Sequence, residues 1–358
     1  MQIVFIANAN SIHTLRWISY FIKNKNEITL ISIEKPNHTT IIEFNKLKKK
    51  VKVFYLNSFI SIISAINFLI NKNYSLVHIH YLGWHSLLSA FIKKSSKLIL
   101  TPWGSDLLFN KNNVLKKFWL AKLFKRSDFL ICDSKRLESE SVFLGMNKDK
   151  TLISMFGVDT DIYKKSRRIF SMKKNFIVGS NRNHEDVYDI ITLLNASKII
   201  CKMRDDVEFY LAGSGSLKQM HIDYVKKNNL DYKVRFLGLL NKEEMLKFYN
   251  DIDIYVSTSL SDGGLSASIA ESMAFERLNI ISNNSDNKKW VRNKSNGYLF
   301  RTSDYKELAK LIINSIKDKE NSLKIAERSR QIIVKRYSYK NEMMKVEQKY
   351  MEICSNIS

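Results

Sequence analysis

The segment DIYVSTSLSDGGLSASIAESMA, Asp253–Ala274, decides the fold class of this chain. It runs from an apolar strand at Ile254–Ser257, through the glycine-containing turn SDGG, into a helix predicted at Ser266–Phe275. A strand that leads directly into a turn and a helix is the repeating unit of parallel α/β sheets. Glycines in such a turn let phosphate oxygens approach backbone amides near the positive helix N-terminus, although many of them serve only the turn itself. The segment therefore predicts an α/β domain with a candidate phosphate site.

The same alternation of apolar strands and amphipathic helices extends in both directions from this segment. Strands are predicted in one group at Gln2–Ala7, Ile28–Ile33, Val51–Tyr55, Leu76–His80, Leu98–Thr101 and Phe129–Asp133, and in another at Phe176–Ser180, Val207–Ala212, Val234–Gly238, Ile254–Ser257 and Asn279–Ser282. A basic linker, Lys164–Lys174, separates the groups, and 358 residues exceed the size at which one hydrophobic core keeps growing. We therefore predict two Rossmann-like domains, residues 1–165 and 166–334, followed by a C-terminal helix within residues 335–358.

The formal net charge of the chain is +23. An excess of this size suggests a polyanionic partner, such as nucleic acid, an anionic membrane or a phosphorylated substrate. A genome that favours lysine codons would explain the charge equally well, so only local clusters of basic residues are informative. No helix-turn-helix, zinc or RNP signature is found, which argues against a nucleic-acid partner.

The cysteines and the apolar runs bear on the cellular compartment. Cys132, Cys201 and Cys354 are far apart, and none has a neighbouring Cys or His at metal-ligand spacing, so reduced thiols in a cytosolic protein are expected. The start MQIVFIANAN lacks the pattern of a signal peptide. The longest nearly apolar run, Ser58–Ile70, is too short to span a bilayer. We expect a protein that is soluble or lies on a membrane without crossing it.

A second glycine-containing turn, AGSGS at Ala212–Ser216, also leads from a predicted strand into a predicted helix. Its Gly213 and Gly215 are candidates for phosphate contacts, or for a purely structural turn. Rossmann domains that bind NAD place a full G-x-G-x-x-G after their first strand. Here the first strand leads into NANSIHT, which has no glycine, so NAD binding is disfavoured.

Several motifs follow one another along nearly the whole chain. They are TPWGSD (Thr101–Asp106), FGVDTDIY (Phe156–Tyr163), VGSNR (Val178–Arg182), YLAGSGS (Tyr210–Ser216), VRFLGLL (Val234–Leu240), the Asp253–Ala274 segment and NGYLF (Asn296–Phe300). In this order they resemble the retaining GT-B glycosyltransferases often numbered family 4. The resemblance implies a deep cleft between an acceptor-binding, membrane-facing first domain and a second domain that binds the nucleotide sugar. It also implies that the last helix crosses back to the first domain.

The resemblance assigns the donor side to the second domain. Its E-x7-E signature places one carboxylate at Glu271, where it would accept hydrogen bonds from both ribose hydroxyls. The other position falls on Gly263, and Asp262 directly precedes it. Either Asp262 takes over that role, or the loop amides alone hold the donor sugar. The candidates for amide contacts to the diphosphate or the sugar are Gly263, Gly264, Leu265 and Ser266.

Departure of the diphosphate needs cations or amides, and no metal is expected to be required. The family's phosphate-binding arginine matches Arg182, whereas the position of its usual lysine holds Tyr188. Lys218 or the helix end at Gly215 are the candidates to replace that lysine.

The acceptor side would lie in the first domain. The histidine that relatives carry after the fifth strand is replaced here by Trp103, which would stack on a sugar or a lipid group. Asp106 then becomes the better polar candidate for catalysis, beside Asp262 and Glu271. His13, in the first loop, and His80, at the end of a strand, are candidates for acceptor contacts, although His80 would equally fit a buried core position.

The segment KNNVLKKFWLAKLFKR, Lys111–Arg126, carries six basic residues and no acidic one. Its composition fits an amphipathic helix lying in a lipid headgroup layer, or a packed helix whose lysines face water. The residues expected to face the membrane are Lys116, Lys117, Trp119, Lys122, Lys125 and Arg126.

These features predict a retaining glycosyltransferase on the cytoplasmic face of the plasma membrane. It would transfer a sugar from a nucleotide donor, expected to be UDP-linked, to a saccharide or lipid-linked saccharide in the synthesis of a cell-surface glycan. A nucleotide-sugar epimerase of the same fold is the first alternative, and a basic nucleic-acid-binding protein is the second.

Overall fold

The computed structural model describes residues 1–38, 40–108, 114–154, 157–164, 170, 175–262, 266–284 and 287–355. The chain divides into two compact units, which are described separately below. The first comprises Met1–Phe156 and Lys340–Ser358, and the second comprises Gly157–Tyr339. No helix among the described residues is long and apolar enough to cross a membrane.

The first unit is built around a parallel seven-stranded sheet in the order β3-β2-β1-β4-β5-β6-β7. Its strands are β1 (Gln2–Ala7), β2 (Glu27–Ser32), β3 (Val51–Tyr55), β4 (Leu76–His80), β5 (Lys97–Thr101), β6 (Phe129–Cys132) and β7 (Thr151–Ile153). Its helices before the last one are α1 (Ile12–Lys23), α2 (Ile41–Lys48), α3 (Phe59–Asn71), the 3₁₀ helix η1 (Trp84–Phe91), α4 (Ser105–Leu108), α5 (Val114–Arg126), α6 (Lys135–Phe143) and the short 3₁₀ helix η2 (Lys148–Lys150). The order 3-2-1-4-5-6 is that of a Rossmann fold.

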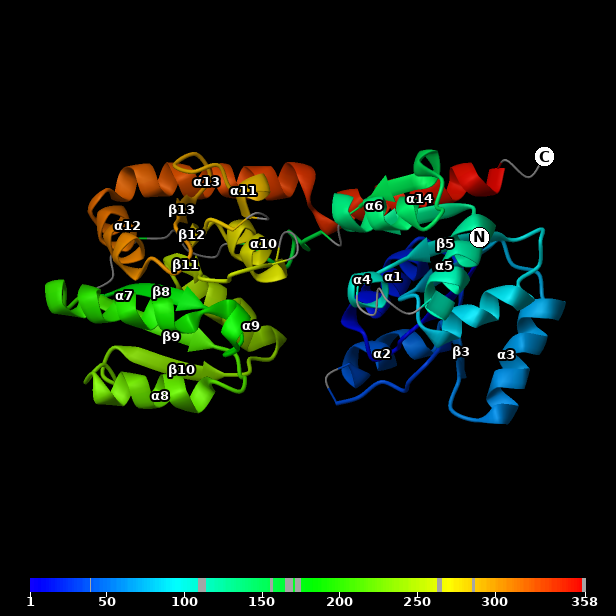
Figure 1. The fold of residues 1–358 in the computed structure, drawn as a ribbon, viewed down its shortest axis with the longest axis horizontal. Coiled ribbons are helices and arrows are strands. Elements are labelled where there is room, and N and C mark those ends of the chain that lie inside the picture. The colour runs from blue at the N-terminus through cyan, green and yellow to red at the C-terminus, as the bar shows by residue number, and fades with distance from the viewer. Residues whose placement is uncertain are drawn as a thin grey trace. The chain divides into compact units, whose positions relative to one another are not determined.

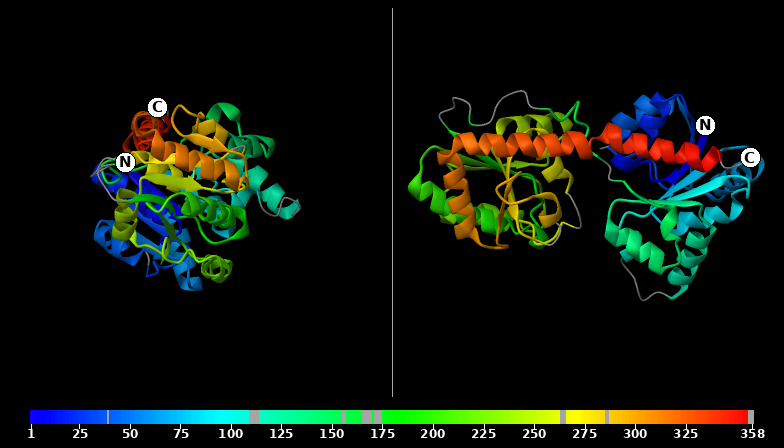
Figure 2. Two further views of the ribbon diagram at one scale, coloured as in Figure 1. Left: turned by 90° about the vertical axis from the view of Figure 1, so that its left-hand side faces the viewer. Right: turned by 90° about the horizontal axis from the view of Figure 1, so that it is seen from above.

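The last helix, α14 (Tyr339–Ser355), packs in the first unit beside α1 (Figure 2). The rings of Phe21 and Tyr350 stack with their centroids 4.9 Å apart, and Tyr20 donates a hydrogen bond to Glu347 at 2.8 Å. Glu342 accepts a hydrogen bond from Ser154 at 2.9 Å. These contacts hold the C-terminal segment against the unit that contains the start of the chain.

The second unit contains a parallel six-stranded sheet in the order β10-β9-β8-β11-β12-β13. Its strands are β8 (Phe176–Ser180), β9 (Val207–Ala212), β10 (Val234–Gly238), β11 (Ile254–Ser257), β12 (Leu278–Ser282) and β13 (Tyr298–Phe300). Its helices are α7 (Ile190–Met203), α8 (Lys218–Lys227), α9 (Lys242–Asp251), α10 (Ala267–Ala274), α11 (Asn287–Trp290), α12 (Tyr305–Lys317) and α13 (Lys319–Arg336), with the short 3₁₀ helix η3 (Asp186–Tyr188).

Alternate residues of the strands β8, β9, β11 and β12 in the second sheet enter two separate cores. In β11, Ile254 and Val256 pack with α7 and α12, whereas Tyr255 packs with α9 and α10 on the opposite face. Both faces of a parallel sheet are normally covered by helices, which explains why the central strands β8, β11 and β12 carry no charged residue. Figure 1 shows α7 and α12 on one side of the sheet and α9 and α10 on the other.

The predicted fold class, two Rossmann-like units with parallel sheets, is confirmed. Two edge strands, β7 and β13, were not predicted. Each has only three residues, which is too short for a periodic pattern to be recognised.

Candidate functional site

The candidate site of the second unit lies where the carboxyl ends of β8 and β11 are adjacent. Within the sheet, β9 lies next to one edge of β8 and β11 lies next to the other edge, so the strand order reverses at β8. Such a reversal of strand order is the usual ligand-binding position of an open α/β sheet. The loop after β8 carries Arg182, and the loop after β11 carries Asp262.

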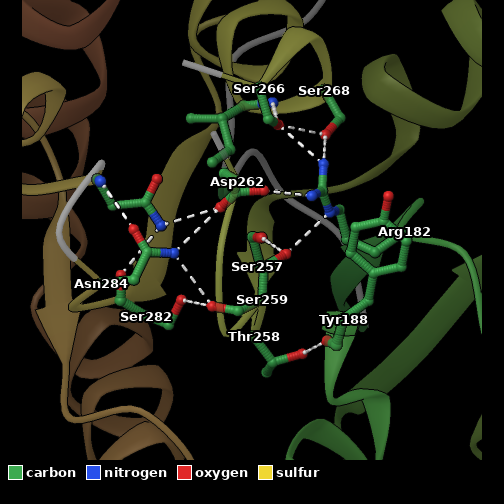
Figure 3. Close-up of polar contacts among 12 residues, drawn as sticks. Arg182, Tyr188, Ser257, Thr258, Ser259, Asp262, Ser266, Ser268, Ser282 and Asn284 are labelled. Atoms are coloured by element: carbon green, nitrogen blue, oxygen red, sulfur yellow. Dashed lines mark hydrogen bonds and ion pairs between the residues drawn. The ribbon is translucent and has the colours of Figure 1, made fainter. Parts of the chain in front are cut away.

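The guanidinium of Arg182 is held by four side chains from this edge of the sheet (Figure 3). Its Nε donates a hydrogen bond to Ser259 at 3.0 Å. Its Nη1 donates to the hydroxyls of Ser266 and Ser268 at 2.9 and 3.0 Å. Its Nη2 forms an ion pair with Asp262. The Arg182 side chain is 11% exposed and that of Asp262 is 0% exposed, so the pair is almost withdrawn from water.

Tyr188 and two asparagines complete this arrangement. The Tyr188 ring, which occupies the position of the expected lysine, lies 4.4 Å from the guanidinium carbon of Arg182. The second carboxylate oxygen of Asp262 accepts hydrogen bonds from Asn284 and Asn287 at 3.3 and 3.2 Å. Asp262 therefore has partners at both oxygens, and it fixes the direction in which the guanidinium points.

Glu271 lies half-buried on α10 and belongs to a second hydrogen-bond chain. Its Oε2 accepts a hydrogen bond from the hydroxyl of Tyr249 at 2.9 Å. Asn181 donates to that hydroxyl at 2.8 Å and accepts from the hydroxyl of Tyr255 at 2.8 Å. Burial, together with the nearby Glu271 carboxylate, raises the pKa of Tyr249 well above its ordinary value. Tyr249 therefore stays protonated and holds the Glu271 carboxylate in place.

Two positions of the AGSGS turn, Gly213 and Gly215, have no room for a side chain. Gly213 has a φ of +112°, and a Cβ built on it would lie 2.8 Å from the carbonyl oxygen of Arg182. A Cβ on Gly215 would collide with the carbonyl oxygen of His184. The absence of side chains thus lets this turn lie directly against the Arg182 loop. Lys218, half-buried, is the first residue of α8 after the turn.

The loop that joins β11 to α10 is described only at its two ends. Gly263, Gly264 and Leu265, which we expect to contact the donor, lie outside the described residues. Ser266 caps the N-terminus of α10, and its hydroxyl accepts a hydrogen bond from the amide of Ile269 at 3.3 Å. The described parts of the chain contain no group of three or more His, Cys, Asp or Glu side chains that could hold a metal ion.

In the first unit, Asp106 connects two loops at the carboxyl edge of the sheet. Its Oδ2 accepts a hydrogen bond from the amide of Leu82 at 2.7 Å, and its Oδ1 accepts one from the amide of Trp103 at 2.9 Å. The residue is 2% exposed, and burial raises the pKa of its carboxyl group. The loops after β4 and β5 are therefore tied together through this one carboxylate.

The acceptor-side candidates occupy two environments. His13 and Trp103 are half-buried, with ring centroids 4.9 Å apart. His80 is 1% exposed, its Nε2 lies 3.3 Å from His78 Nδ1, and burial lowers its pKa to about 3. His78 in turn shares a hydrogen bond with Tyr350 of α14. The structure thus places His80 within the core and leaves His13 and Trp103 nearer to solvent.

Comparison with known proteins identifies the family of the chain. Residues 160–332 match the family model of glycosyl transferases group 1, and residues 2–134 match that of glycosyl transferase 4-like proteins. The chain belongs to the GT-B glycosyltransferases of the family 4 type. An uncharacterized glycosyltransferase of Methanocaldococcus jannaschii is 27% identical over 91% of this chain and 89% of its own length.

One solved structure of similar fold and one further relative have more specific descriptions. The crystal structure of Anabaena HepE in complex with UDP superposes with a TM-score of 0.78 at 15% identity, and it covers 98% of this chain and 100% of its own. The N-acetylgalactosamine-N,N'-diacetylbacillosaminyl-diphospho-undecaprenol 4-alpha-N-acetylgalactosaminyltransferase of Campylobacter jejuni is 23% identical. That match covers 69% of this chain and 65% of the relative.

The basic segment of this glycosyltransferase forms α5, which is described from Val114; Lys111 lies outside the described residues. Lys117, Lys122 and Lys125 are exposed, whereas Lys116 and Arg126 are half-buried. Trp119, which we expected to face the membrane, instead packs against the core and donates a hydrogen bond to Ser86 at 3.1 Å. The large exposed apolar residues of α5 are Val114, Leu115 and Phe118.

Sequence reasoning missed several partners in the donor-side loops of this glycosyltransferase. Asn181 and His184 flank Arg182 in the VGSNRNH loop, where their position directly after a strand was the available signal. His184 Nδ1 lies 2.9 Å from His221 Nδ1, so one ring donates a hydrogen bond to the other. Burial lowers the pKa of His184 to about 4, so this histidine is neutral near pH 7. No local pattern connects this loop residue with His221, which lies on α8.

Proposed function

We propose that this glycosyltransferase transfers a sugar from a UDP-linked donor to a lipid-linked saccharide with retention of the anomeric configuration. The UDP complex of Anabaena HepE supports the choice of nucleotide. The Campylobacter relative, whose acceptor is a diphospho-undecaprenol saccharide, supports a lipid-linked acceptor.

The observation that carries the proposal is the fixed guanidinium of Arg182 beside the N-terminus of α10. A leaving diphosphate gains negative charge as the glycosidic bond breaks, and an oriented cation stabilises that charge without further reorganisation. The helix N-terminus adds about half a positive charge. Asp262, Ser259, Ser266 and Ser268 fix the orientation of the cation. Gly213 and Gly215 shape the same loop, and Lys218 supplies a second cation nearby.

The remaining candidates have distinct roles in this proposal. Glu271 accepts hydrogen bonds from the ribose hydroxyls, and the hydroxyl of Tyr249 orients this carboxylate by donating a hydrogen bond to its Oε2. Asp262 is a positioning residue for Arg182. Asp106 positions Trp103, which forms the acceptor side together with His13.

The proposed activity is tested by incubating the protein with UDP-sugars and a lipid-linked saccharide. Release of UDP that depends on the acceptor is expected, and proton NMR of the first product should show the anomeric configuration of the donor. Turnover of the nucleotide sugar without an acceptor would instead indicate an epimerase or a hydrolase. An inverted product would contradict retention.

Transfer is expected to continue in the presence of EDTA. Arg182 and the N-terminus of α10 provide positive charge at the proposed diphosphate position, so the leaving group is stabilised without a metal ion. The rate of UDP release is measured with EDTA and again after addition of Mg²⁺ or Mn²⁺. Loss of activity in EDTA that is restored by a divalent cation would contradict this mechanism.

The proposal places the protein on the cytoplasmic membrane surface through α5. Each Lys close to an anionic surface contributes on the order of 1 kcal/mol to binding. Changing Lys116, Lys117, Lys122 and Lys125 to Glu is therefore expected to abolish sedimentation with anionic vesicles. UDP binding should not change, because Arg182 belongs to the other unit.

A matched control for this charge reversal exists in the second unit. Changing the exposed Lys226, Lys227, Lys242 and Lys317 to Glu alters the net charge by the same amount. This control should keep binding to vesicles. Failure of the wild-type protein to bind anionic vesicles at low salt, where charges are least screened, would contradict the membrane role of α5.

A further inference from the structure

A long part of the first unit contains no acidic residue. Between Glu43 and Asp106 the chain carries nine lysines and no aspartate or glutamate. Within this part, α3 has the sequence FISIISAINFLIN and η1 has the sequence WHSLLSAF, and neither contains a charged residue. Helices at a protein surface normally carry charged or polar residues on the outward side.

Apolar side chains lie on both sides of α3, and the other exposed residues on its outward side are the uncharged Ser64, Asn67 and Asn71. Ala65 and Leu69 are buried, and Ile62, Ile66 and Phe68 pack against the same core. On the outward side, Phe59 and Ile60 are 78% and 77% exposed, and Ile63 and Ile70 are 49% and 47% exposed. Figure 1 shows α3 at the edge of its unit. Apolar side chains grouped at a surface in this way mark an interaction site.

The neighbouring helix η1 extends this apolar surface. It packs against α3 and exposes Trp84, Leu87 and Phe91 at 54%, 51% and 40%. The large apolar residues exposed on the two helices, which we call the α3–η1 face, are Phe59, Ile60, Ile63, Ile70, Trp84, Leu87 and Phe91.

Lysines gather at the C-terminal end of α3. Lys52 Nζ lies 5.0 Å from the centre of the Phe68 ring, and Lys93 Nζ donates a hydrogen bond to Asn73 at 3.0 Å. Lys72 directly follows the last residue of the helix and is exposed. The apolar face is therefore bordered by positive charge, with no acidic residue in this part of the sequence.

We infer that the α3–η1 face inserts into the headgroup and upper acyl layer of an anionic lipid bilayer. Apolar side chains such as Phe59 and Trp84 can enter the interfacial layer of a bilayer, and nearby lysines add attraction to anionic lipids. A second copy of the chain would bring two positive borders together, and their repulsion opposes such a dimer. The inference rests on the proposed lipid-linked acceptor, and it adds an apolar attachment to the charged one at α5.

The test removes apolar surface without changing charge. Phe59→Ser, Ile60→Ser and Ile63→Ser are combined, and Met203→Ser, Met220→Ser and Leu239→Ser in the second unit are the matched control. Because all six side chains are well exposed, neither variant should unfold, and circular dichroism checks this. Sedimentation with equimolar phosphatidylglycerol and phosphatidylcholine vesicles should weaken about tenfold or more for the α3 variant and stay unchanged for the control.

A second measurement locates the inserted face. Bilayers that contain brominated phosphatidylcholine should quench part of the tryptophan fluorescence, and Trp84→Phe should remove most of that quenching. Vesicle binding of the α3 variant equal to wild type would overturn the inference, even if the α5 charge reversal abolishes binding. A wild-type dimer that the α3 variant converts to a monomer would also overturn it, in favour of a second copy. Loss of UDP binding or transfer with intact vesicle binding would instead count against the proposed function alone.

Discussion

Replacing Arg182 by alanine is expected to weaken UDP binding by about 10- to 100-fold, since a hydrogen bond to a charged group contributes about 1.5–3 kcal/mol. The same change should destabilise the second unit. Asp262, whose side chain is 0% exposed, would lose its cation, and breaking a buried ion pair from one side costs about 3–5 kcal/mol. Isothermal calorimetry with UDP and chemical denaturation measure the two effects.

The two effects of this substitution can be separated by a second change. Combining Arg182→Ala with Asp262→Asn removes the unpaired carboxylate, so most of the stability should return. The affinity for UDP should stay low, because the cation is still missing. If folded Arg182→Ala binds UDP as tightly as wild type, the guanidinium does not contact the diphosphate, and its role is limited to holding the loop.

Replacing Glu271 by alanine is expected to lower kcat/KM by about 100-fold, because two hydrogen bonds from ribose hydroxyls to a carboxylate are lost. The fold should survive, since Glu271 is half-buried and its removal leaves no cavity in the apolar core. Acceptor-dependent release of UDP measures the rate, and thermal unfolding measures the stability.

Two conservative variants serve as controls for Glu271. Glu271→Gln keeps the shape of the side chain and one carbonyl acceptor, so its loss of activity should be smaller. Tyr249→Phe removes the hydrogen bond that orients the carboxylate, and it should reduce activity less than Glu271→Ala. Transfer by Glu271→Ala at nearly the wild-type rate would show that this carboxylate does not bind the donor.

The donor-side residues show what local sequence patterns can predict and what they cannot. The strand–turn–helix segment around Asp253–Ala274 and the VGSNR motif were sufficient to select Arg182, Asp262 and Glu271 as candidates. The sequence assigned Arg182 and Asp262 to separate contacts with the donor. In the structure they are partners in one ion pair, although they lie 80 positions apart. Such a pairing depends on which strands become neighbours in the sheet, and no local pattern contains that information.

In the first unit, local sequence patterns likewise did not predict the contacts of Asp106 and Trp119. The TPWGSD motif presented Asp106 as a catalytic candidate, whereas the structure shows both of its oxygens bonded to the amides of Leu82 and Trp103. Trp119 lies within a basic helix, yet it faces the core and bonds to Ser86. The composition of a segment indicates that a helix has polar and apolar sides. Which side is covered is set by the elements that pack against it.

The sequence by itself determined the two parallel α/β units and the loops in which the candidate residues lie. Alternating strands and helices are encoded within short stretches, because the period of apolar residues and the turn glycines act locally. The tertiary structure alone decided that Arg182 is fixed by Asp262 and three serines, that Glu271 is held by Tyr249, and that α3 keeps an apolar side exposed. These features depend on contacts between segments far apart in the chain, and such contacts form only when the sheets and their covering helices pack together.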